Sequence, residues 1–306
     1  MILNCGEALI DMLPRQTGDG EEAFAPYPGV AVFNTAIALG RLGTPSGFFC
    51  GISTDLFGEI LETSLADANV DTSLSVRSSR PTTLAFVKLI DGQATYTFYD
   101  ENSAMRMLTP DDLPMLPDAV EALVFGCISL VSEPCGSAFE ALMMREAPRR
   151  VTMIDPNIRT SFITDETSYR ARMTRMIATA DIVKLSDEDL AWLYGDGDIL
   201  IHAQNIIAQG PKLVCITEGA KGAHGITKDL QIFENATKVD VADTVGAGDT
   251  FNAGILSSLH SAGVLTKSAL AELDESTVRN ALSMGTRSAA ITVSRAGANP
   301  PWAHEL

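Results

Sequence analysis

Positive charge is scarce in this sequence. Lysine and arginine number 22 against 39 aspartates and glutamates, which gives a formal net charge of −17 at pH 7. A chain this acidic lacks the basic surface with which proteins bind the phosphate backbone of nucleic acids. We therefore expect no nucleic-acid partner. A phosphate group would have to be held locally, by backbone N–H groups and a few cations.

Cysteine pairs and long apolar runs are also lacking. The five cysteines form no Cys-x-x-Cys pair and most lie in apolar segments, so we expect buried free thiols, as is usual in a reducing cytosol. The four histidines show no metal-ligand spacing. Residues 1–14 lack the basic start of a signal peptide, and no apolar run is long enough to cross a bilayer. These absences predict a cytoplasmic protein without a membrane partner.

The sequence does have the composition of a globular enzyme, with 306 residues of which 46% are hydrophobic. Strand-like segments alternate with helix-like ones, which predicts an α/β fold with a mainly parallel sheet, in a single domain over residues 1–306. Strands are predicted at residues 2–10, 122–125, 151–154, 182–185 and 213–217. Helices are predicted at residues 34–42, 57–68, 138–145, 170–178, 187–194, 251–262 and 277–291.

One stretch breaks this alternation. Residues 82–89 and 95–99 both have strand-like sequences, and the turn pair Asp91-Gly92 lies between them without a helix. The irregular residues 13–27 could supply further edge strands. We interpret these pieces as a small β lid made from about residues 12–28 and 74–106. An ordinary surface hairpin is the alternative.

The most informative segment is 243–254. Three small residues, Gly246, Ala247 and Gly248, stand before Asp249, and an apolar helix-like run follows. Small residues at a helix start let free backbone N–H groups converge on an anion. Asp249 fits there as a base that takes a proton from a hydroxyl attacking a phosphoryl group held by these N–H groups. An alternative is a glycine turn followed by an ordinary acid in the first turn of a helix. The residues alone favour neither interpretation over the other.

The run Asp-Thr-Val-Gly-Ala-Gly-Asp-Thr-Phe at 243–251 resembles the C-terminal signature of the ribokinase-type carbohydrate kinases. Further segments match in the family's order over nearly the whole chain. The resemblance implies a ribokinase-like three-layer sandwich with a mainly parallel central sheet. It also implies ATP and Mg²⁺ as cofactors, with K⁺ as a further ion. The family's β lid covers the sugar and often forms a homodimer contact.

The resemblance also implies roles for the residues of the phosphoryl-transfer site. Asp249 would be the catalytic base, and the N–H groups of Gly246, Ala247 and Gly248 would hold the transferring group. The segment Asp-Pro-Asn-Ile-Arg at 155–159 is similar to a motif of fructokinases and ketodeoxygluconate kinases. It implies a cationic role for Arg159 near the sugar or the phosphate. Asp-Pro-Asn is also common turn sequence.

For the sugar side, residues 28–43 are similar to the family's N-terminal signature. They imply that Gly29 and Asn34 contact the sugar, together with Asp11 at the end of the first strand. Without the resemblance, Asp11 is a solvated turn acid and Asn34 is a helix N-cap. Val30 stands where a second glycine is usual in the family. Because valine tolerates positive φ poorly, it could reshape this loop.

Residues 98–106 follow the predicted hairpin and bear on the choice of sugar. The ketodeoxygluconate kinases of the family often place an arginine after two aromatic residues here, and this chain has Asp100 after Tyr99. An aspartate would repel an acid sugar and favour a neutral one. Arg106 lies close enough in sequence to reach an anion. We assign Tyr99 and Arg106 to the substrate site.

The resemblance places ATP along several later segments. The residues implied in ATP binding are Lys184, Ser186, Thr217, Gly219, Gly222, Gly248 and Ala289. Asp189 would help to place Mg²⁺ through water, and Asp243 would belong to a monovalent-cation site. For Ser186 an N-cap role with acids in the first turn is an equally complete explanation.

Taken together, these residues predict an ATP-dependent kinase that phosphorylates a primary hydroxyl of a small sugar, and we expect fructokinase activity. Two alternatives stay open. One is 2-keto-3-deoxygluconate kinase activity. The other is a sugar- or nucleotide-binding regulator without activity, against which the intact Asp249 motif argues.

Overall fold

A mainly parallel β-sheet forms the centre of the molecule. The computed structural model describes residues 1–90 and 93–306. Within them the sheet has nine strands, of which the last two in the chain run antiparallel to their neighbours. In spatial order the strands are β15 (Gln231–Asn235), β14 (Gly222–Ile226), β13 (Leu213–Thr217), β12 (Ile182–Ser186), β11 (Val151–Asp155), β10 (Ala122–Gly126), β1 (Ile2–Cys5), β4 (Ser46–Phe49) and β6 (Val70–Asp71).

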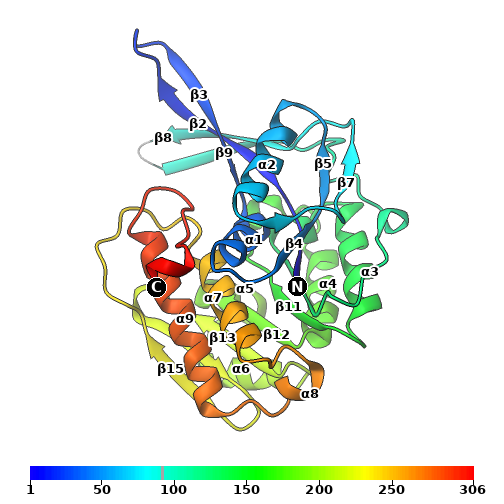
Figure 1. Cartoon of the computed structure of the whole chain (residues 1–306), viewed down its shortest axis with the longest axis vertical. Coiled ribbons are helices and arrows are strands. Elements are labelled where there is room, and N and C mark those ends of the chain that lie inside the picture. Colours follow the sequence, from blue (N-terminus) through cyan, green and yellow to red (C-terminus); the bar gives the residue numbers. More distant parts are fainter. Residues whose placement is uncertain (91–92) are drawn as a thin grey trace.

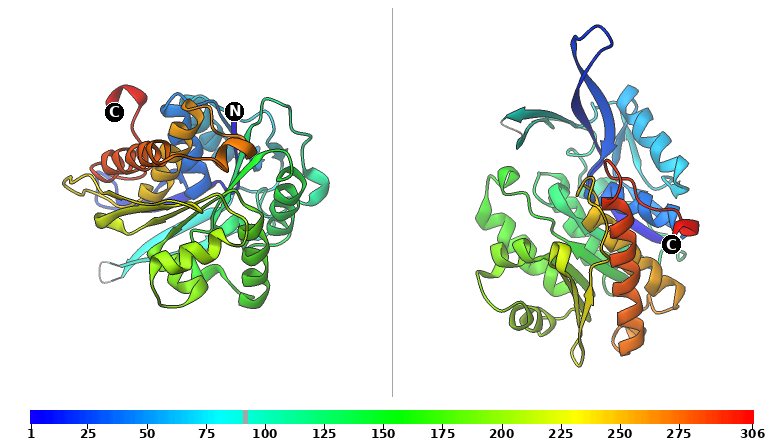
Figure 2. Two further views of the ribbon diagram at one scale, coloured as in Figure 1. Left: turned by 90° about the horizontal axis from the view of Figure 1, so that it is seen from below. Right: turned by 90° about the vertical axis from the view of Figure 1, so that its left-hand side faces the viewer.

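Helices cover both faces of this sheet and give three layers (Figure 2). One face carries α1 (Ala31–Arg41), α7 (Ala247–Ser261), α8 (Lys267–Leu270) and α9 (Glu275–Val293). The other carries α3 (Cys135–Glu146), α4 (Glu166–Thr179), α5 (Asp187–Tyr194) and α6 (Ile199–Ile207). The helix α2 (Leu56–Asp67) packs against α1 at the β6 edge of the sheet. All residues of β1, β10 and β11 are buried, as expected for parallel strands covered on both sides. The α/β prediction is confirmed.

A second, four-stranded sheet rises from one end of the central sheet (Figure 1). Its order is β3 (Glu22–Gly29), β2 (Leu9–Gln16), β8 (Leu84–Ile90) and β9 (Gln93–Tyr99). The long β2–β3 hairpin projects farthest from the body. A short pair, β5 (Gly51–Ser53) and β7 (Val76–Ser78), lies beside α2. The predicted turn at Asp91-Gly92 falls outside the described residues.

The first predicted strand, residues 2–10, is wrong as a single element. β1 ends at Cys5 and β2 begins at Leu9, because the chain leaves the central sheet there and enters the small one. At Gly6 a Cβ atom would lie 2.6 Å from Cγ2 of Val32, so only glycine allows this close approach of α1.

The two antiparallel strands β14 and β15 and the helix α6 have no counterpart in the predictions. The α6 sequence, Ile-Leu-Ile-His-Ala-Gln-Asn-Ile-Ile, is a short apolar run whose periodicity does not separate helix from strand. Among the described residues, no helix has the length and hydropathy of a membrane span. All five cysteines are buried free thiols, as predicted.

Candidate active site

The N-terminus of α7 forms a tight backbone turn at the end of the central sheet. Gly246, the N-cap, has φ 78°, and a Cβ atom there would lie 2.8 Å from Cβ of Ala298. Both the left-handed conformation and the close neighbour therefore require glycine. The helix starts at Ala247, earlier than the predicted residue 251. The Ala247 amide donates to the backbone oxygen of Thr244 (3.3 Å), and the other N–H groups of the first turn, together with the helix dipole, provide an anion-binding position.

Asp249 lies in this first turn with only 6% of its surface exposed. Nδ2 of Asn34 donates a hydrogen bond to its Oδ2 (2.9 Å), and Oγ1 of Thr35 donates to its backbone oxygen (3.2 Å). Burial raises the pKa of Asp249 from 3.8 to about 7, and the bond from Asn34 opposes this rise. A carboxyl group with such a pKa can accept a proton at neutral pH, which an exposed first-turn acid does less well.

Asp11, Gly29 and Asn34 converge beside Asp249. A Cβ atom on Gly29 would lie 3.3 Å from Oδ2 of Asp11 and 4.0 Å from Oδ1 of Asn34. Asp11 belongs to β2, where it pairs with Tyr27 and Ala85, so the interpretation as a solvated turn acid is wrong. Partial burial raises its pKa to about 6.

The start of α1 differs from the sequence-based expectations, which placed the helix at residues 34–42 with Asn34 as a possible N-cap. The helix begins at Ala31, so Asn34 lies inside it and is not its N-cap. The N-cap is Val30, whose side chain makes no capping hydrogen bond and whose backbone has φ 93° and ψ 154°. Such a conformation is strained for a β-branched residue. The valine that replaces the usual glycine has thus kept a glycine-like turn.

Behind Asp249 lies a buried polar cluster in which Lys184, already assigned to ATP binding, is joined by two residues that no motif had assigned to the site, Asp155 and Asn252. Nζ of Lys184 donates to Oδ2 of Asp155 (3.0 Å), and Nδ2 of Asn252 donates to the same oxygen (2.7 Å). Burial lowers the pKa of Lys184, but the carboxylates of Asp155 and Asp189 outweigh burial and raise it. A Cβ atom on Gly248 would lie 3.0 Å from Nζ of Lys184, so this ammonium group abuts the anion turn.

Ser186 and Asp189 form a capping box at the start of α5. Oγ of Ser186 accepts from the Asp189 amide (3.0 Å), and Oδ2 of Asp189 accepts from the Ser186 amide (3.3 Å). Oδ1 of Asp189 accepts from the amide of Ile158 (2.9 Å) and so ties α5 to the loop that carries Arg159. The described residues contain no group of three or more histidines, cysteines or acids placed to hold a metal ion.

Arg159 is exposed and lies close enough to Asp249 to lower its pKa. Its guanidinium donates to the backbone oxygen of Ile158 (3.2 Å). It is therefore an exposed cation near Asp249.

The glycine loop after β13 is shaped by its neighbours. Thr217 ends β13, and Gly219 has φ 53°. Gly222 has φ 141°, and a Cβ atom there would lie 2.1 Å from the backbone oxygen of Glu234, so it allows β14 to pair with β15. Ala289 is partly buried in α9 against the core on the α7 side.

Asp243 joins two loops near the start of α7. Its Oδ1 accepts from the amide of Val245 (3.0 Å), and its Oδ2 accepts from the amide of Gly297 (2.9 Å).

Tyr99 and Arg106 do not join the cluster around Asp249. In the small sheet, Asp11 lies opposite Ala85, which lies opposite Phe98, so these three share a face. Tyr99 is on the other face and is 62% exposed. Its assignment to the substrate site is therefore wrong, and Phe98 lies on the face of Asp11 instead. One residue of register decides the face.

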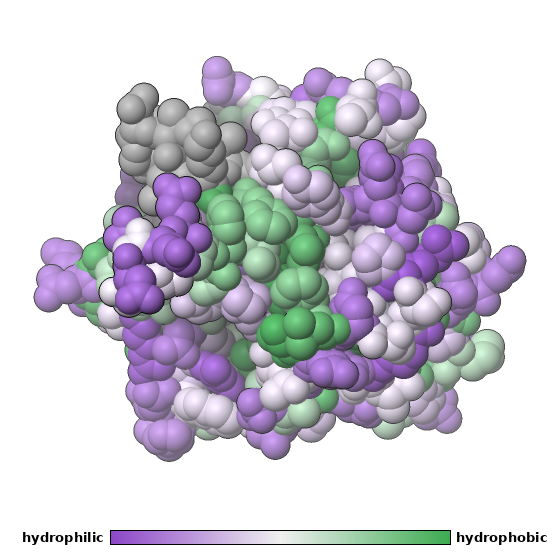
Figure 3. All heavy atoms as spheres, turned by 90° about the horizontal axis from the view of Figure 1, so that it is seen from above, coloured by the Kyte–Doolittle hydropathy of each residue, from purple (hydrophilic) through white to green (hydrophobic). Residues whose placement is uncertain are grey.

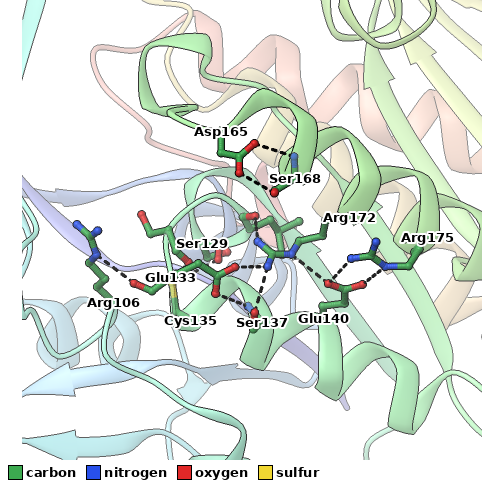
Figure 4. A network of polar contacts seen from close by, with 12 residues as sticks. Arg106, Ser129, Glu133, Cys135, Ser137, Glu140, Asp165, Ser168, Arg172 and Arg175 are labelled. Carbon is green, nitrogen blue, oxygen red and sulfur yellow. Dashed lines mark hydrogen bonds and ion pairs between the residues drawn. The ribbon is translucent and has the colours of Figure 1, made fainter.

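Arg106 pairs with Asp100 at 3.3 Å and donates from Nε to the backbone oxygen of Glu133 (3.2 Å; Figure 4). Asp100 also accepts from the hydroxyls of Thr83 and Ser103 (3.1 Å each). Its charge is thus balanced locally, and the predicted repulsion of an acid sugar by a free Asp100 carboxylate is not supported. Arg106 is occupied by the same contacts.

Comparison with known proteins explains this arrangement. The model of the pfkB family of carbohydrate kinases matches residues 2–305. The chain belongs to this family. It is 58% identical over 282 residues to a fructokinase of Rhizobium leguminosarum bv. trifolii, an alignment that covers 92% of this chain and 86% of the relative. It is 34% identical to a fructokinase of Klebsiella pneumoniae, over 85% of this chain and 84% of the relative. The enzyme is therefore a carbohydrate kinase.

Solved structures agree in fold. The fructokinase of Xylella fastidiosa with bound ATP has a TM-score of 0.87 and 29% identity, covering 97% of this chain and 93% of that one. A double mutant of the Vibrio cholerae O395 fructokinase, with fructose, ADP and potassium bound, has a TM-score of 0.84 and 27% identity at the same coverage. The ribokinase-like fold prediction is confirmed.

Proposed function

We propose that this pfkB-family kinase transfers the γ-phosphoryl group of ATP to a primary hydroxyl of fructose. The observation that carries the proposal is the buried Asp249, oriented by Asn34 at the N-terminus of α7. The 58% identical relative is a fructokinase, and the Vibrio cholerae structure holds fructose and ADP. The chain covers most of both proteins.

In the proposed reaction, Asp249 accepts the proton of the attacking hydroxyl while that oxygen bonds to the γ-phosphorus and ADP leaves. The N–H groups of Gly246 and Gly248 stabilise the charge of the transferring group, and that of Ala247 joins them by exchanging its bond to the Thr244 oxygen. Asp11, Gly29 and Asn34 hold the other sugar hydroxyls. Arg159 assists where sugar and phosphate meet.

The proposed nucleotide side uses the loops after β12 and β13. Lys184 adds positive charge beneath Gly248. The proposed contacts to the phosphates and ribose come from the loop residues Ser186, Thr217, Gly219 and Gly222, and Ala289 would border the adenine.

The proposal also includes Mg²⁺, which when bound would neutralise phosphate charge. Proteins commonly hold it through one or two carboxylates plus the phosphates. Asp155, whose buried Oδ1 has no hydrogen-bond partner, and Asp189 fit that requirement.

A monovalent cation is proposed near Asp243, where two backbone loops meet. The support is the potassium in the Vibrio cholerae structure. A related structure of the same fructokinase holds calcium.

We further propose that residues 1–306 form one domain with the small sheet as its lid, and that two chains pair through the lid. Phe24, Phe86 and Tyr99 make edge-on ring contacts along the face turned away from Asp11. Phe24 and Tyr99 are exposed, and Figure 3 shows apolar surface at this end of the molecule. A cytoplasmic location is supported by the five free thiols.

A coupled assay of ADP release tests the function. We expect kcat/KM to be higher for fructose than for 2-keto-3-deoxygluconate and for nucleosides. A higher value for the acid sugar would refute the substrate. Absence of turnover with every sugar, in folded protein that binds ATP, would refute kinase activity.

Light scattering of wild type and Tyr99→Glu tests the pairing of two chains, since a charge among the apolar rings of Phe24, Phe86 and Tyr99 should separate a dimer.

A further inference from the structure

Glu7 is a fully buried acid with no role in the reaction described above. It lies between β1 and β2 and has 0% of its surface exposed. Its Oε1 accepts from the amide of Val32 (3.3 Å), and its Oε2 accepts from the amide of Ser129 (3.0 Å). One carboxyl group thus joins the first turn of α1 to the 3₁₀ turn Cys127–Leu130 that follows β10.

Both segments held by Glu7 contain a strained residue. Val30, directly before α1, has φ 93°, and Cys127, the first residue of the 3₁₀ turn, has φ 54°. Non-glycine residues hold such conformations only where the surroundings impose them. Val30 itself supplies no capping side chain, so the carboxyl group of Glu7 caps α1 from another part of the chain.

The two segments also border the sugar side of the site. Val30 and Ala31 pack with Cys127, Ile128 and Ala85 in a small apolar cluster beneath the lid sheet. Asn34 lies one helical turn after Val30 and bonds Asp249. The nucleotide side lies on other elements, β12, β13 and α7. A shift of the α1 start would therefore move the sugar contacts and leave the ATP contacts in place.

We infer that Glu7 is a positioning residue, which holds the strained Val30 turn so that Asn34 meets both the sugar and Asp249. This inference rests on the proposed function of the site. It separates Glu7 from residues that only stabilise the fold, because it predicts an effect on one substrate and not on the other.

The test is Glu7→Gln, assayed with fructose and with ATP as the varied substrate. An amide offers one acceptor oxygen where the carboxyl group offers two, so one of the two N–H groups loses its partner. We expect KM for fructose to rise by about tenfold or more, as for a small misplacement of a positioning group, while KM for ATP stays unchanged. The acid limb of kcat should also move to higher pH, because the bond from Asn34 favours the ionised form of Asp249.

Two further variants sharpen the test. Val30→Gly relieves the strain that Glu7 counteracts, so adding it to Glu7→Gln should restore most of the fructose KM. Glu146→Gln is the matched control, because Glu146 is an equally buried glutamate that pairs with arginines at the end of α3. Glu146→Gln should lower the melting temperature without raising KM for fructose relative to KM for ATP.

Equal changes in both KM values, or no change, would overturn the inference, as would a double variant no better than Glu7→Gln. If Glu7→Gln does not fold, the double variant is compared with Val30→Gly. A double variant that also fails to fold would show a purely structural role. If the wild type phosphorylates a different sugar, the proposed substrate fails, and the same separation is measured with that sugar.

Discussion

Replacing Asp249 by asparagine should inactivate the enzyme and stabilise it at the same time. Asparagine cannot accept the proton, so we expect kcat to fall by roughly 10²–10⁴-fold. The oxygen of the new side chain can still accept the bond from Asn34, so the local packing should be kept. Activity and stability are thus predicted to change in opposite directions, as is common for residues that serve catalysis at a cost to folding.

The size of the stabilisation follows from the pKa of Asp249, which burial raises from 3.8 to about 7. Below pH 3.8 the carboxyl group is protonated in both the folded and the unfolded chain. Between pH 3.8 and 7 the unfolded chain loses its proton first, so the wild type loses stability as pH rises, and the penalty is complete above pH 7. A shift of this size corresponds to at most about 4 kcal/mol, and asparagine removes it.

Thermal unfolding of wild type and Asp249→Asn from pH 4 to 8 measures this difference. The two melting temperatures should agree near pH 4 and separate as pH rises, by up to about 8 °C at a scale of about 2 °C per kcal/mol. An ordinary first-turn acid gives the opposite result, because its removal costs about 0.3–1 kcal/mol and little activity. A variant with near-wild-type kcat and a lower melting temperature at pH 8 would refute the assignment of the base.

Three further outcomes are expected. The pH profile of kcat/KM for the sugar should have an acid limb near pH 7 from Asp249, and a limb near pH 4 would contradict its burial. Val30→Gly should raise the urea midpoint, because relief of about 1–3 kcal/mol of strain exceeds the 0.5–1 kcal/mol entropic cost of glycine; a lower midpoint would mean that the turn is unstrained. Gly222→Ala should lower the melting temperature by several degrees, since its Cβ would meet the Glu234 oxygen at 2.1 Å, and an unchanged value would contradict this packing.

Local patterns predicted much of the fold and the centre of the site. Segment 243–251 indicated a helix N-terminus with an acid in an anion turn, and α7 begins there. The positions of Asp155 and Asn252 could not be predicted in this way. Asp155 accepts hydrogen bonds from Lys184, 29 positions away, and from Asn252, 97 positions away, and nothing in the local sequence marks this acid as buried. The assignment of Tyr99 to the substrate site was wrong for another reason. The face on which its side chain lies depends on a strand register that only the assembled sheet defines.

The hydrogen bond between Asn34 and Asp249 spans 215 positions of sequence. Since its two ends are made far apart in time during translation, an emerging chain has no oriented base until α7 has left the ribosome and docked on α1. Thr44 and Ser257 reinforce this docking through a hydroxyl contact of 2.8 Å across a similar separation. Nascent chains that stop short of α7 should therefore bind no sugar productively. A cut between β15 and α7 would place Asn34 and Asp249 on different fragments, so each fragment alone should be inactive.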